Sequence, residues 1–312
     1  MKILANDGIS QSGIDALTAN GFEVITINVA QEQLIEYINT NDVKALLVRS
    51  ATTARKELID ACPGLQLIGR GGVGMDNIDV DYAREKGLKV FNTPAASSDS
   101  VAELVMGHMR GLVRFLHDSN RQMPLEGDSK FGALKKSYAK GVELRGRTLG
   151  IVGFGRIGQA LAKLAIGAGM KVIFSDMHEK HVDVELEFFD GQKATFTCEN
   201  AGFERVLSES DFISVHVPGG DLIGKNEISK MKDGVFLMNA SRGGVVNEEA
   251  LLEAIESGKV AGVGLDVYTN EPTPAVKVLM NGKVSITPHI GAATLEAQDR
   301  IGTELAAHID EL

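Results

Sequence analysis

The sequence predicts an α/β protein made of two doubly wound parallel-sheet domains. Short aliphatic runs alternate with segments of helical periodicity along nearly the whole chain, and the alternation restarts as a second series near residue 147. Strand–helix–strand succession is typical of a parallel sheet whose two faces are covered by helices. The length of 312 residues exceeds what one hydrophobic core usually organises and suits two domains.

The first series occupies residues 1–98. Segments 10–20 and 31–39 carry apolar side chains at helical spacing, and the short apolar runs around them are the expected strands. Those strands are predicted at residues 2–4, 23–27, 45–48, 65–68 and 89–91. A long helix is expected over residues 98–118, and the polar stretch 119–141 is expected to be a loop with a short helix.

The second series begins with an apolar run at residues 147–152 and ends in a polar-faced helix at residues 294–312. Its further strands are predicted at residues 171–175, 212–216, 235–239, 260–265 and 284–286. Segments 182–188 and 194–198 break this rhythm, because they alternate apolar and polar residues on either side of Asp190-Gly191. That pattern predicts a β-hairpin, which we interpret as a surface insertion rather than a functional flap.

The composition is that of a soluble globular protein, with 44% hydrophobic and 24% charged residues. A net charge of -10 opposes binding to nucleic acid or to an anionic membrane. The two cysteines, Cys62 and Cys198, are too few and too far apart to predict a disulfide framework or a metal site. We find neither a signal peptide nor a run of about 18 apolar residues, so we expect a cytoplasmic protein.

A nucleotide-binding turn is predicted at Gly153-Phe154-Gly155-Arg156-Ile157-Gly158, which lies between an apolar strand and a helix. In such a G-x-G-x-x-G turn, Gly153 makes the tight bend, Gly155 admits a pyrophosphate, and Gly158 lets helix and strand pack closely. The predicted helix begins at Arg156, and the free backbone N–H groups of its first residues, Arg156 and Ile157, point toward the pyrophosphate. This context predicts a Rossmann-type dinucleotide site.

Asp176 identifies the dinucleotide. It ends the next predicted strand, 18 residues after Gly158, where an acid binds the adenosine ribose hydroxyls. A carboxylate at this place repels a 2′-phosphate, so we expect NAD rather than NADP as the cofactor.

Three further segments place reactive side chains just after strands, where ligands bind in open α/β sheets. One contains Arg242, the second contains Asp266 and Glu271, and the third contains His289. A histidine exchanges protons near neutral pH, and a neighbouring carboxylate orients it. An arginine offers two-point contact to a carboxylate. Together these residue types predict reduction of a keto acid or oxidation of a hydroxy acid.

The sequence resembles the D-2-hydroxyacid dehydrogenase family over essentially its whole length. The resemblance implies that Arg242 anchors the substrate carboxylate and keto oxygen, that His289 is the acid/base, and that Glu271 is its hydrogen-bonded partner. It also implies that Asp266 orients the nicotinamide carboxamide. The motifs that carry it are residues 153–158, 239–244, 266–272 and 288–294.

The same resemblance implies a domain arrangement. A Rossmann-type NAD-binding domain, residues 99–290, is expected to be inserted in a flavodoxin-like substrate-binding domain made of residues 1–98 and 291–312. Members of the family are commonly homodimers joined through the cofactor domains, so we expect a homodimer with the helix over residues 98–118 at the contact.

Within the family the chain is most similar to the phosphoglycerate dehydrogenase branch, through residues 48–52 and 68–77. This similarity implies that the amides of Val73 and Gly74 hold the substrate carboxylate. Arg49 and Arg70, which follow strands of the substrate-binding domain, are expected to bind the phosphate. The expected reaction is oxidation of 3-phospho-D-glycerate to 3-phosphohydroxypyruvate, in serine biosynthesis, by a short form without the serine-binding regulatory domain.

Two alternatives remain open. A hydroxypyruvate or glyoxylate reductase or a D-lactate dehydrogenase would share the catalytic residues, and Arg49 and Arg70 argue against it. A corepressor-like protein that binds NAD and recruits peptide partners would also retain similar residues, and turnover with NADH would exclude it.

Overall fold

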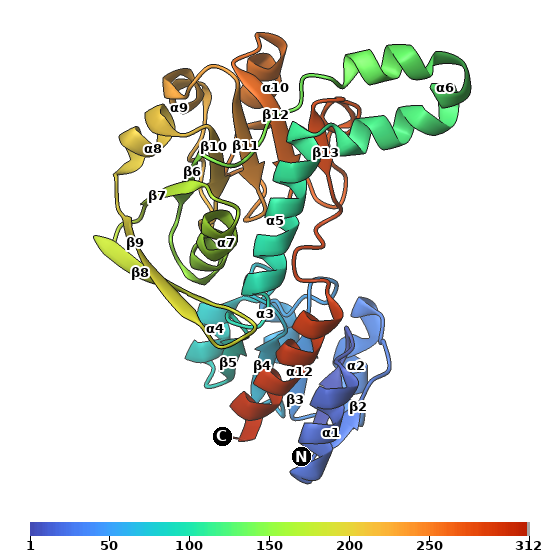
Figure 1. Cartoon of the computed structure of the whole chain (residues 1–312). Helices are drawn as coiled ribbons and strands as arrows, with labels where there is room; N and C mark the ends of the chain where they lie inside the picture. The colour runs from blue at the N-terminus through green and yellow to red at the C-terminus, as the bar shows by residue number, and fades with distance from the viewer. Residues whose placement is uncertain (311–312) are drawn as a thin grey trace. The chain divides into compact units, whose positions relative to one another are not determined.

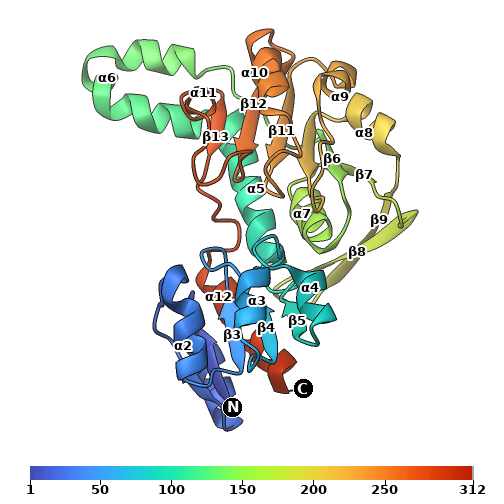
Figure 2. The ribbon, with the colours of Figure 1, turned by 180° about the vertical axis from the view of Figure 1, so that it is seen from behind.

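The computed structural model describes residues 1–310, and the last two residues of the helix expected over 294–312 lie outside that range. The chain divides into two compact units (Figures 1 and 2). Unit 1 comprises Met1–Ser100 and Ala292–Leu312, and unit 2 comprises Val101–Gly291. Each unit contains a parallel sheet with helices on both faces, which confirms the predicted fold class.

The described part of unit 1 contains a five-stranded parallel sheet in the order β2-β1-β3-β4-β5, the flavodoxin-like order. The closing helix packs against the first helix, where a Cβ on Gly13 would lie 2.8 Å from the Cα of Gly302. The strands are β1 (Lys2–Ala5), β2 (Glu23–Ile25), β3 (Ala45–Val48), β4 (Leu67–Arg70) and β5 (Lys89–Asn92). The helices are α1 (Gln11–Ala19), the 3-10 turn η1 (Gln31–Gln33), α2 (Leu34–Thr40), α3 (Lys56–Ala61), α4 (Val80–Glu85) and α12 (Leu295–Asp310).

Unit 2 contains a six-stranded parallel sheet in the order β13-β12-β11-β10-β6-β7. The strand order reverses between β6 and β10, so the carboxyl ends of these two strands form the switch point where open α/β sheets bind ligands. The strands are β6 (Thr148–Val152), β7 (Lys171–Ser175), β10 (Phe212–Val215), β11 (Val235–Asn239), β12 (Val260–Leu265) and β13 (Val284–Ile286). The helices after β6 are α7 (Arg156–Gly167), α8 (Phe203–Glu209), α9 (Lys225–Lys230), α10 (Glu248–Glu256) and α11 (Val276–Leu279).

The segment between the two series differs from the prediction. The expected helix over residues 98–118 is α5 (Ser98–Val113), and it ends early because Phe115 adopts a left-handed backbone with φ 56°. The expected loop over residues 119–141 is wrong, since α6 (Leu116–Ser137) is helical on both sides of a break at Lys130. Most of α6 is exposed, so its residues show no apolar stripe from which a helix could be recognised.

The hairpin predicted around Asp190-Gly191 is confirmed as the antiparallel pair β8 (His181–Glu187) and β9 (Lys193–Glu199). One face of the hairpin packs on the core of unit 2, where Val184 and Cys198 are buried together with Phe174. Its turn is exposed. Within residues 1–310, no helix is both long enough and apolar enough to cross a membrane.

Candidate active site

The glycine-rich turn follows β6 at the switch point of the unit 2 sheet. Gly153 has φ +87°, and a Cβ there would lie 2.4 Å from the carbonyl oxygen of His216, the residue after β10. A Cβ on Gly158 would lie 2.5 Å from the carbonyl oxygen of Gly153. Both positions therefore require glycine. At Gly155, by contrast, a Cβ would meet no described atom within 4 Å, so the backbone there is open to a ligand.

The turn leads directly into the amino end of α7, whose first residues are Arg156 and Ile157. Gly155 and Arg156 are exposed, whereas Phe154 is buried and stacks on Phe174 with ring centroids 3.9 Å apart. An open backbone at the positive end of a helix fits the pyrophosphate of a dinucleotide.

Asp176 lies beside this turn, immediately after β7. Its carboxylate accepts hydrogen bonds from the backbone N–H groups of Phe154, at 2.8 Å, and His178, at 2.9 Å. Burial acts to raise the pKa of Asp176, but the backbone donors outweigh it and the pKa lies below the ordinary value. Asp176 is thus a carboxylate at neutral pH. Its negative charge next to the turn suits ribose hydroxyls and opposes a 2′-phosphate.

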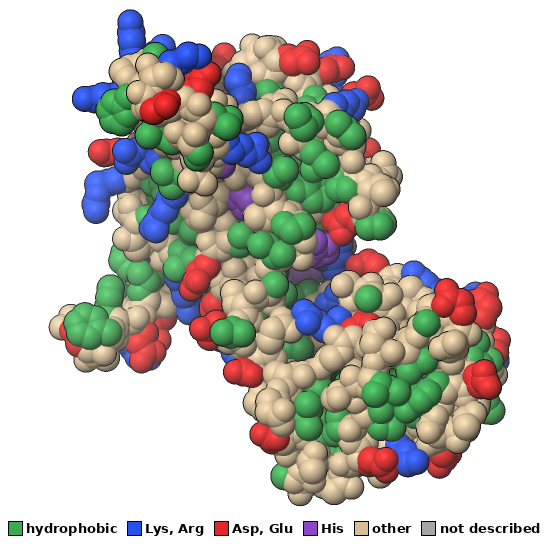
Figure 3. All heavy atoms as spheres, turned by 90° about the vertical axis from the view of Figure 1, so that its right-hand side faces the viewer, with side chains coloured by type: hydrophobic (Ala, Val, Ile, Leu, Met, Phe, Trp, Pro, Cys, Tyr) green, Lys and Arg blue, Asp and Glu red, His purple; other side chains and the backbone are tan. Residues whose placement is uncertain are grey.

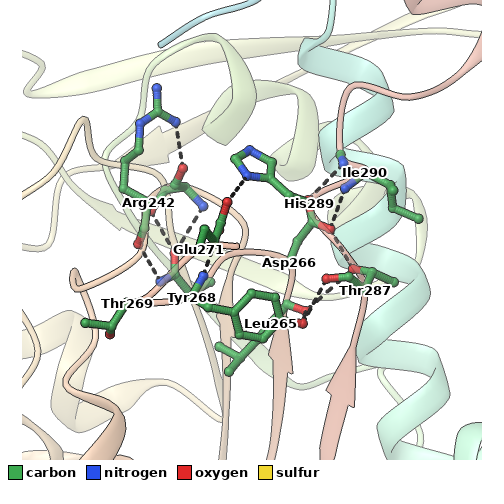
Figure 4. A network of polar contacts seen from close by, with 12 residues as sticks. Arg242, Leu265, Asp266, Tyr268, Thr269, Glu271, Thr287, His289 and Ile290 are labelled. Atoms are coloured by element: carbon green, nitrogen blue, oxygen red, sulfur yellow. Dashed lines mark hydrogen bonds and ion pairs between the residues drawn. The ribbon is translucent and has the colours of Figure 1, made fainter. Parts of the chain in front are cut away.

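His289 and Glu271 form a hydrogen-bonded pair at the carboxyl edge of the same sheet (Figure 4). The distance from Nδ1 of His289 to Oε2 of Glu271 is 2.8 Å, and Oε1 of Glu271 accepts the backbone N–H of Tyr268 at 2.9 Å. Glu271 is therefore held at both oxygens. Because Nδ1 of His289 faces Glu271, Nε2 is the ring nitrogen that remains for a substrate.

Asp266 lies behind this pair and is 2% exposed. Its Oδ1 accepts the hydroxyl of Thr287 at 2.7 Å and the N–H of Ile290 at 2.8 Å, and its Oδ2 accepts the N–H of Gly291 at 2.8 Å. The carboxylate therefore spans the residues on both sides of His289, whose own backbone is left-handed with φ 55°. Burial, with the charge of Asp266 as a second cause, raises the pKa of the nearby Tyr268 to about 12.

Arg242 lies on the turn after β11, and this turn is built by its own polar groups. Asn239 accepts the N–H of Ser241 at 3.0 Å and donates to the carbonyl of Arg242 at 2.9 Å. The guanidinium of Arg242 donates to the carbonyl of Ser241 at 2.7 Å. A Cβ on Gly243 would lie 1.8 Å from the carbonyl oxygen of Tyr268. The backbone of the Arg242 turn therefore lies directly against the turn that leads to Glu271 (Figure 4).

Unit 1 contains the remaining residues named from the sequence. Arg49 follows β3 and Arg70 ends β4, two strands that pair directly with Val48 opposite Arg70. The guanidinium of Arg70 lies over Gly72, where a Cβ would be 1.6 Å from Nη1, and donates to the carbonyl of Gly71 at 3.3 Å.

The turn that Arg70 covers continues into Val73, which is exposed, and Gly74, which is half-buried. In unit 1 the structure thus places Arg70 against the turn that contains Val73 and Gly74. In unit 2 it brings Arg242, Glu271, His289 and Asp266 to one edge of one sheet.

Two polar residues of unit 2 were not recognised from the sequence. Thr287 bonds Asp266, and His108 of α5 bonds Thr287 at 3.1 Å. Thr287 could have been recognised from the sequence, since it directly precedes the Pro288-His289 motif. His108 could not, because it sits in an otherwise apolar helix face and its partners are about 180 residues away.

Comparison with known proteins agrees with this geometry. The family model described as "D-isomer specific 2-hydroxyacid dehydrogenase, NAD binding domain" matches residues 106–291, more than half of the chain. A hydroxypyruvate reductase of Thermotoga maritima is 42% identical, with 99% of this chain and 97% of the relative covered. A D-3-phosphoglycerate dehydrogenase of Archaeoglobus fulgidus is 38% identical over 99% of this chain, which spans only 56% of that relative.

Solved structures give the same result. A glyoxylate reductase from Paecilomyes thermophila is 30% identical with a TM-score of 0.81, covering 99% of this chain and 94% of that one. The holo form of D-mandelate dehydrogenase from Rhodotorula graminis is 25% identical with a TM-score of 0.86, covering 99% and 93%. The chain therefore belongs to the D-isomer-specific 2-hydroxyacid dehydrogenase family and is an NAD-dependent enzyme of that family.

Proposed function

We propose that this enzyme interconverts 3-phospho-D-glycerate and 3-phosphohydroxypyruvate with NAD as the hydride carrier, the reaction that opens the phosphorylated route to serine. The observation that carries the proposal is the pair of arginines, Arg49 and Arg70, at the carboxyl ends of adjacent strands in unit 1. A phosphate near pH 7 carries about -1.5 to -2 charges and favours planar guanidinium donors. Arg242 alone cannot satisfy both a carboxylate and a phosphate.

The residues of unit 2 supply the acid–base chemistry in this proposal. When bound, NAD would supply the hydride chemistry at C2 of the substrate, as acceptor in the oxidation and, in its reduced form, as donor in the reduction. Nε2 of His289 accepts the proton of the 2-hydroxyl during oxidation and donates it during reduction. Glu271 orients the ring through Nδ1 and balances the imidazolium charge. Arg242 holds the substrate carboxylate by two-point contact.

The cofactor assignments are part of the same proposal. Gly155, with the amide groups of Arg156 and Ile157, would hold the pyrophosphate on a turn shaped by Gly153 and Gly158, and Asp176 would hold the adenosine ribose. Asp266, which the resemblance assigns to the nicotinamide carboxamide, has both oxygens bonded within the protein. A carboxylate has lone pairs for further donors, so that role is compatible with its contacts.

The similarity to D-3-phosphoglycerate dehydrogenases over nearly the full length of this chain supports the phosphorylated substrate. A second candidate, reduction of hydroxypyruvate itself, is favoured by the 42% identity to the Thermotoga maritima hydroxypyruvate reductase, whose length matches this chain. The two candidates share every residue of unit 2 named above and differ in their need for Arg49 and Arg70.

The test is a pair of variants assayed on a pair of substrates. Removing a hydrogen bond to a charged group weakens binding by about 1.5–3 kcal/mol, so Arg49→Ala and Arg70→Ala should each reduce kcat/KM for 3-phosphohydroxypyruvate roughly ten- to a hundredfold. Hydroxypyruvate should lose much less. Arg55→Ala is the control, because Arg55 is an exposed unit 1 arginine paired with Asp79. Equal losses on both substrates would assign the arginines a structural role and favour the second candidate.

His289→Ala tests the catalytic assignment independently of the substrate. Turnover should fall roughly 10²- to 10⁴-fold, the usual contribution of a general acid–base group, while NADH binding measured by fluorescence should stay unchanged. Retained turnover in this variant would exclude His289 as the acid/base.

We also propose a homodimer formed through unit 2, with the helix expected over residues 98–118 at the contact and with α6, which follows it in the chain, extending that contact. Four large apolar side chains of the α6 segment are exposed, and Figure 3 shows hydrophobic and basic side chains together at the upper left, over α6. These residues are Leu116, Met123, Leu125 and Phe131. Light scattering should give a mass of twice the chain mass, and Leu125→Asp with Phe131→Asp should give the monomer mass if α6 lies in the contact.

A further inference from the structure

His108 is a buried polar residue for which the catalytic proposal has no use. It lies on α5, is 6% exposed, and both of its ring nitrogens face hydroxyl groups. Nδ1 lies 2.8 Å from the hydroxyl of Ser285 and Nε2 lies 3.1 Å from the hydroxyl of Thr287. Both partners flank the end of β13, the strand that leads into the His289 turn.

The protons of this network can be assigned by elimination. The Thr287 hydroxyl lies 2.7 Å from Oδ1 of Asp266 and 3.5 Å from the carbonyl oxygen of Leu265, and both of these oxygens only accept, so its single proton is used there, chiefly by the nearer Asp266. The oxygen of Thr287 must then accept a proton from Nε2 of His108. Nδ1 of His108 is left as an acceptor, and Ser285 donates to it. One neutral tautomer thus satisfies every group, which agrees with the effect of burial, the largest cause, in lowering the pKa of His108.

The backbone of β12 leaves room for this histidine. A Cβ on Gly264 would lie 2.8 Å from Cβ and 3.0 Å from Cγ of His108. Any larger residue at position 264 would push α5 away from the sheet and separate His108 from Thr287. The close approach of α5 to the sheet therefore depends on Gly264, and it brings His108 within hydrogen-bonding distance of the hydroxyls of Ser285 and Thr287.

We propose that His108 is a positioning residue for the acid/base turn, acting through Thr287 and Asp266 on His289. Asp266 holds the backbone N–H groups of Ile290 and Gly291, which follow His289. A left-handed backbone is unfavourable for a histidine and persists only where its surroundings impose it. The hydrogen bonds from His108 to Thr287 and from Thr287 to Asp266 keep the Asp266 carboxylate oriented, and this carboxylate holds the left-handed backbone of His289 in place. This inference rests on the proposed role of His289.

The experiment is a double-mutant cycle between His108→Leu and Thr287→Val. Loss of one interior hydrogen bond changes an equilibrium by about three- to tenfold, so Thr287→Val should lower kcat by about tenfold and His108→Leu by about three- to tenfold. The double variant should be no slower than Thr287→Val, because the proposed effect of His108 on the turn passes through Thr287. Thr287→Ser, which keeps the hydroxyl, should restore kcat. The Kd for NADH should change less than kcat in all four proteins, because Asp266 is only one of the proposed cofactor contacts.

Two further measurements separate positioning from general loss of stability. Leu112→Val removes apolar packing one turn along α5 and should lower Tm without lowering kcat at 25 °C. In Thr287→Val, the pH profile of reduction should move to more acidic values, because His289 is held less firmly against Glu271.

Additive losses of kcat in the cycle would overturn the proposal. A fall of kcat in Leu112→Val as large as that in His108→Leu would overturn it too, because lost stability alone would then account for the effect. His289→Ala distinguishes this failure from failure of the proposed function. If His289→Ala is inactive and the cycle shows no coupling, only the positioning role of His108 is wrong. If His289→Ala is active, the acid/base assignment is itself wrong.

Discussion

Gly243 lies where the turn of Arg242 meets the turn that leads to Glu271, and Gly243→Ala perturbs the distance between these two turns directly. The added methyl would lie 1.8 Å from the carbonyl oxygen and 2.4 Å from the carbonyl carbon of Tyr268, where ordinary contact begins at 3.4 Å. Both opposing atoms are backbone, so no side chain can rotate away. The turns bearing Arg242 and Glu271 must separate by roughly 1.5 Å, a displacement of the size that costs about 10²-fold in rate when it misplaces catalytic groups.

The assay for Gly243→Ala is steady-state reduction of the keto acid with NADH, together with thermal unfolding. We expect kcat/KM to fall about 10²-fold and stability to fall by about 1–3 kcal/mol, the usual effect of overpacking. Gly244→Ala is the matched control: its φ of +82° strains an alanine, but the methyl would meet no described atom within 4 Å. It should lose about 1 kcal/mol of stability and retain activity. If Gly243→Ala keeps kcat/KM within about threefold of the unchanged enzyme, the close contact of the two turns does not govern catalysis.

Three other predictions concern single side chains of unit 2. The kcat/KM for NAD should far exceed that for NADP. Asp176→Ala should reduce the ratio of these two values, mainly by lowering kcat/KM for NAD. Equal values of kcat/KM for both cofactors in the unchanged enzyme would refute this prediction. Glu271→Gln removes the charge beside His289 and should shift the pH–rate profile of reduction to more acidic values; an unchanged profile would remove Glu271 from its role. Burial lowers the pKa of His216 to about 4, so as pH falls from about 6.5 to about 4 only the unfolded chain gains this proton, and the folded state loses up to roughly 3 kcal/mol of stability. Urea unfolding at pH 7 and pH 5 should show about 2 kcal/mol of that loss, since pH 5 lies about 1.5 units below the ordinary pKa. His216→Leu should reduce the loss; an equal pH dependence in both proteins would contradict the assignment.

The strands were predictable from the sequence because both faces of a parallel sheet are buried. Runs such as Ala45–Val48 and Phe212–Val215 are buried at every residue, so they read as uninterrupted aliphatic segments. The α6 segment was not predictable for the opposite reason. Its helices are exposed on most sides and contain Pro124, so neither periodicity nor propensity marks them. The hydrogen bond from the hydroxyl of Tyr138 to the carboxylate of Asp118, at 2.7 Å, forms only because the two ends of α6 meet in space.

Part of the candidate site was likewise predictable from the sequence, and part of it was not. Arg242, Glu271 and His289 were recognisable because each follows a strand of one parallel sheet, and their meeting at one edge is a consequence of that topology. The supporting contacts depend on packing between distant segments. His108 reaches Thr287 only because α5 lies against Gly264, and Gly243 matters only because its backbone touches Tyr268. No local pattern encodes either contact.

The proposed function requires that Arg49 and Arg70 make this enzyme specific for a phosphorylated hydroxy acid. The most direct measurement is kcat/KM for 3-phosphohydroxypyruvate and for hydroxypyruvate, with NADH at fixed ionic strength. A phosphate held by two charge-assisted contacts should favour the phosphorylated substrate by at least about a hundredfold. A preference for hydroxypyruvate, or equal efficiencies, would contradict the claim and make hydroxypyruvate reduction the better assignment.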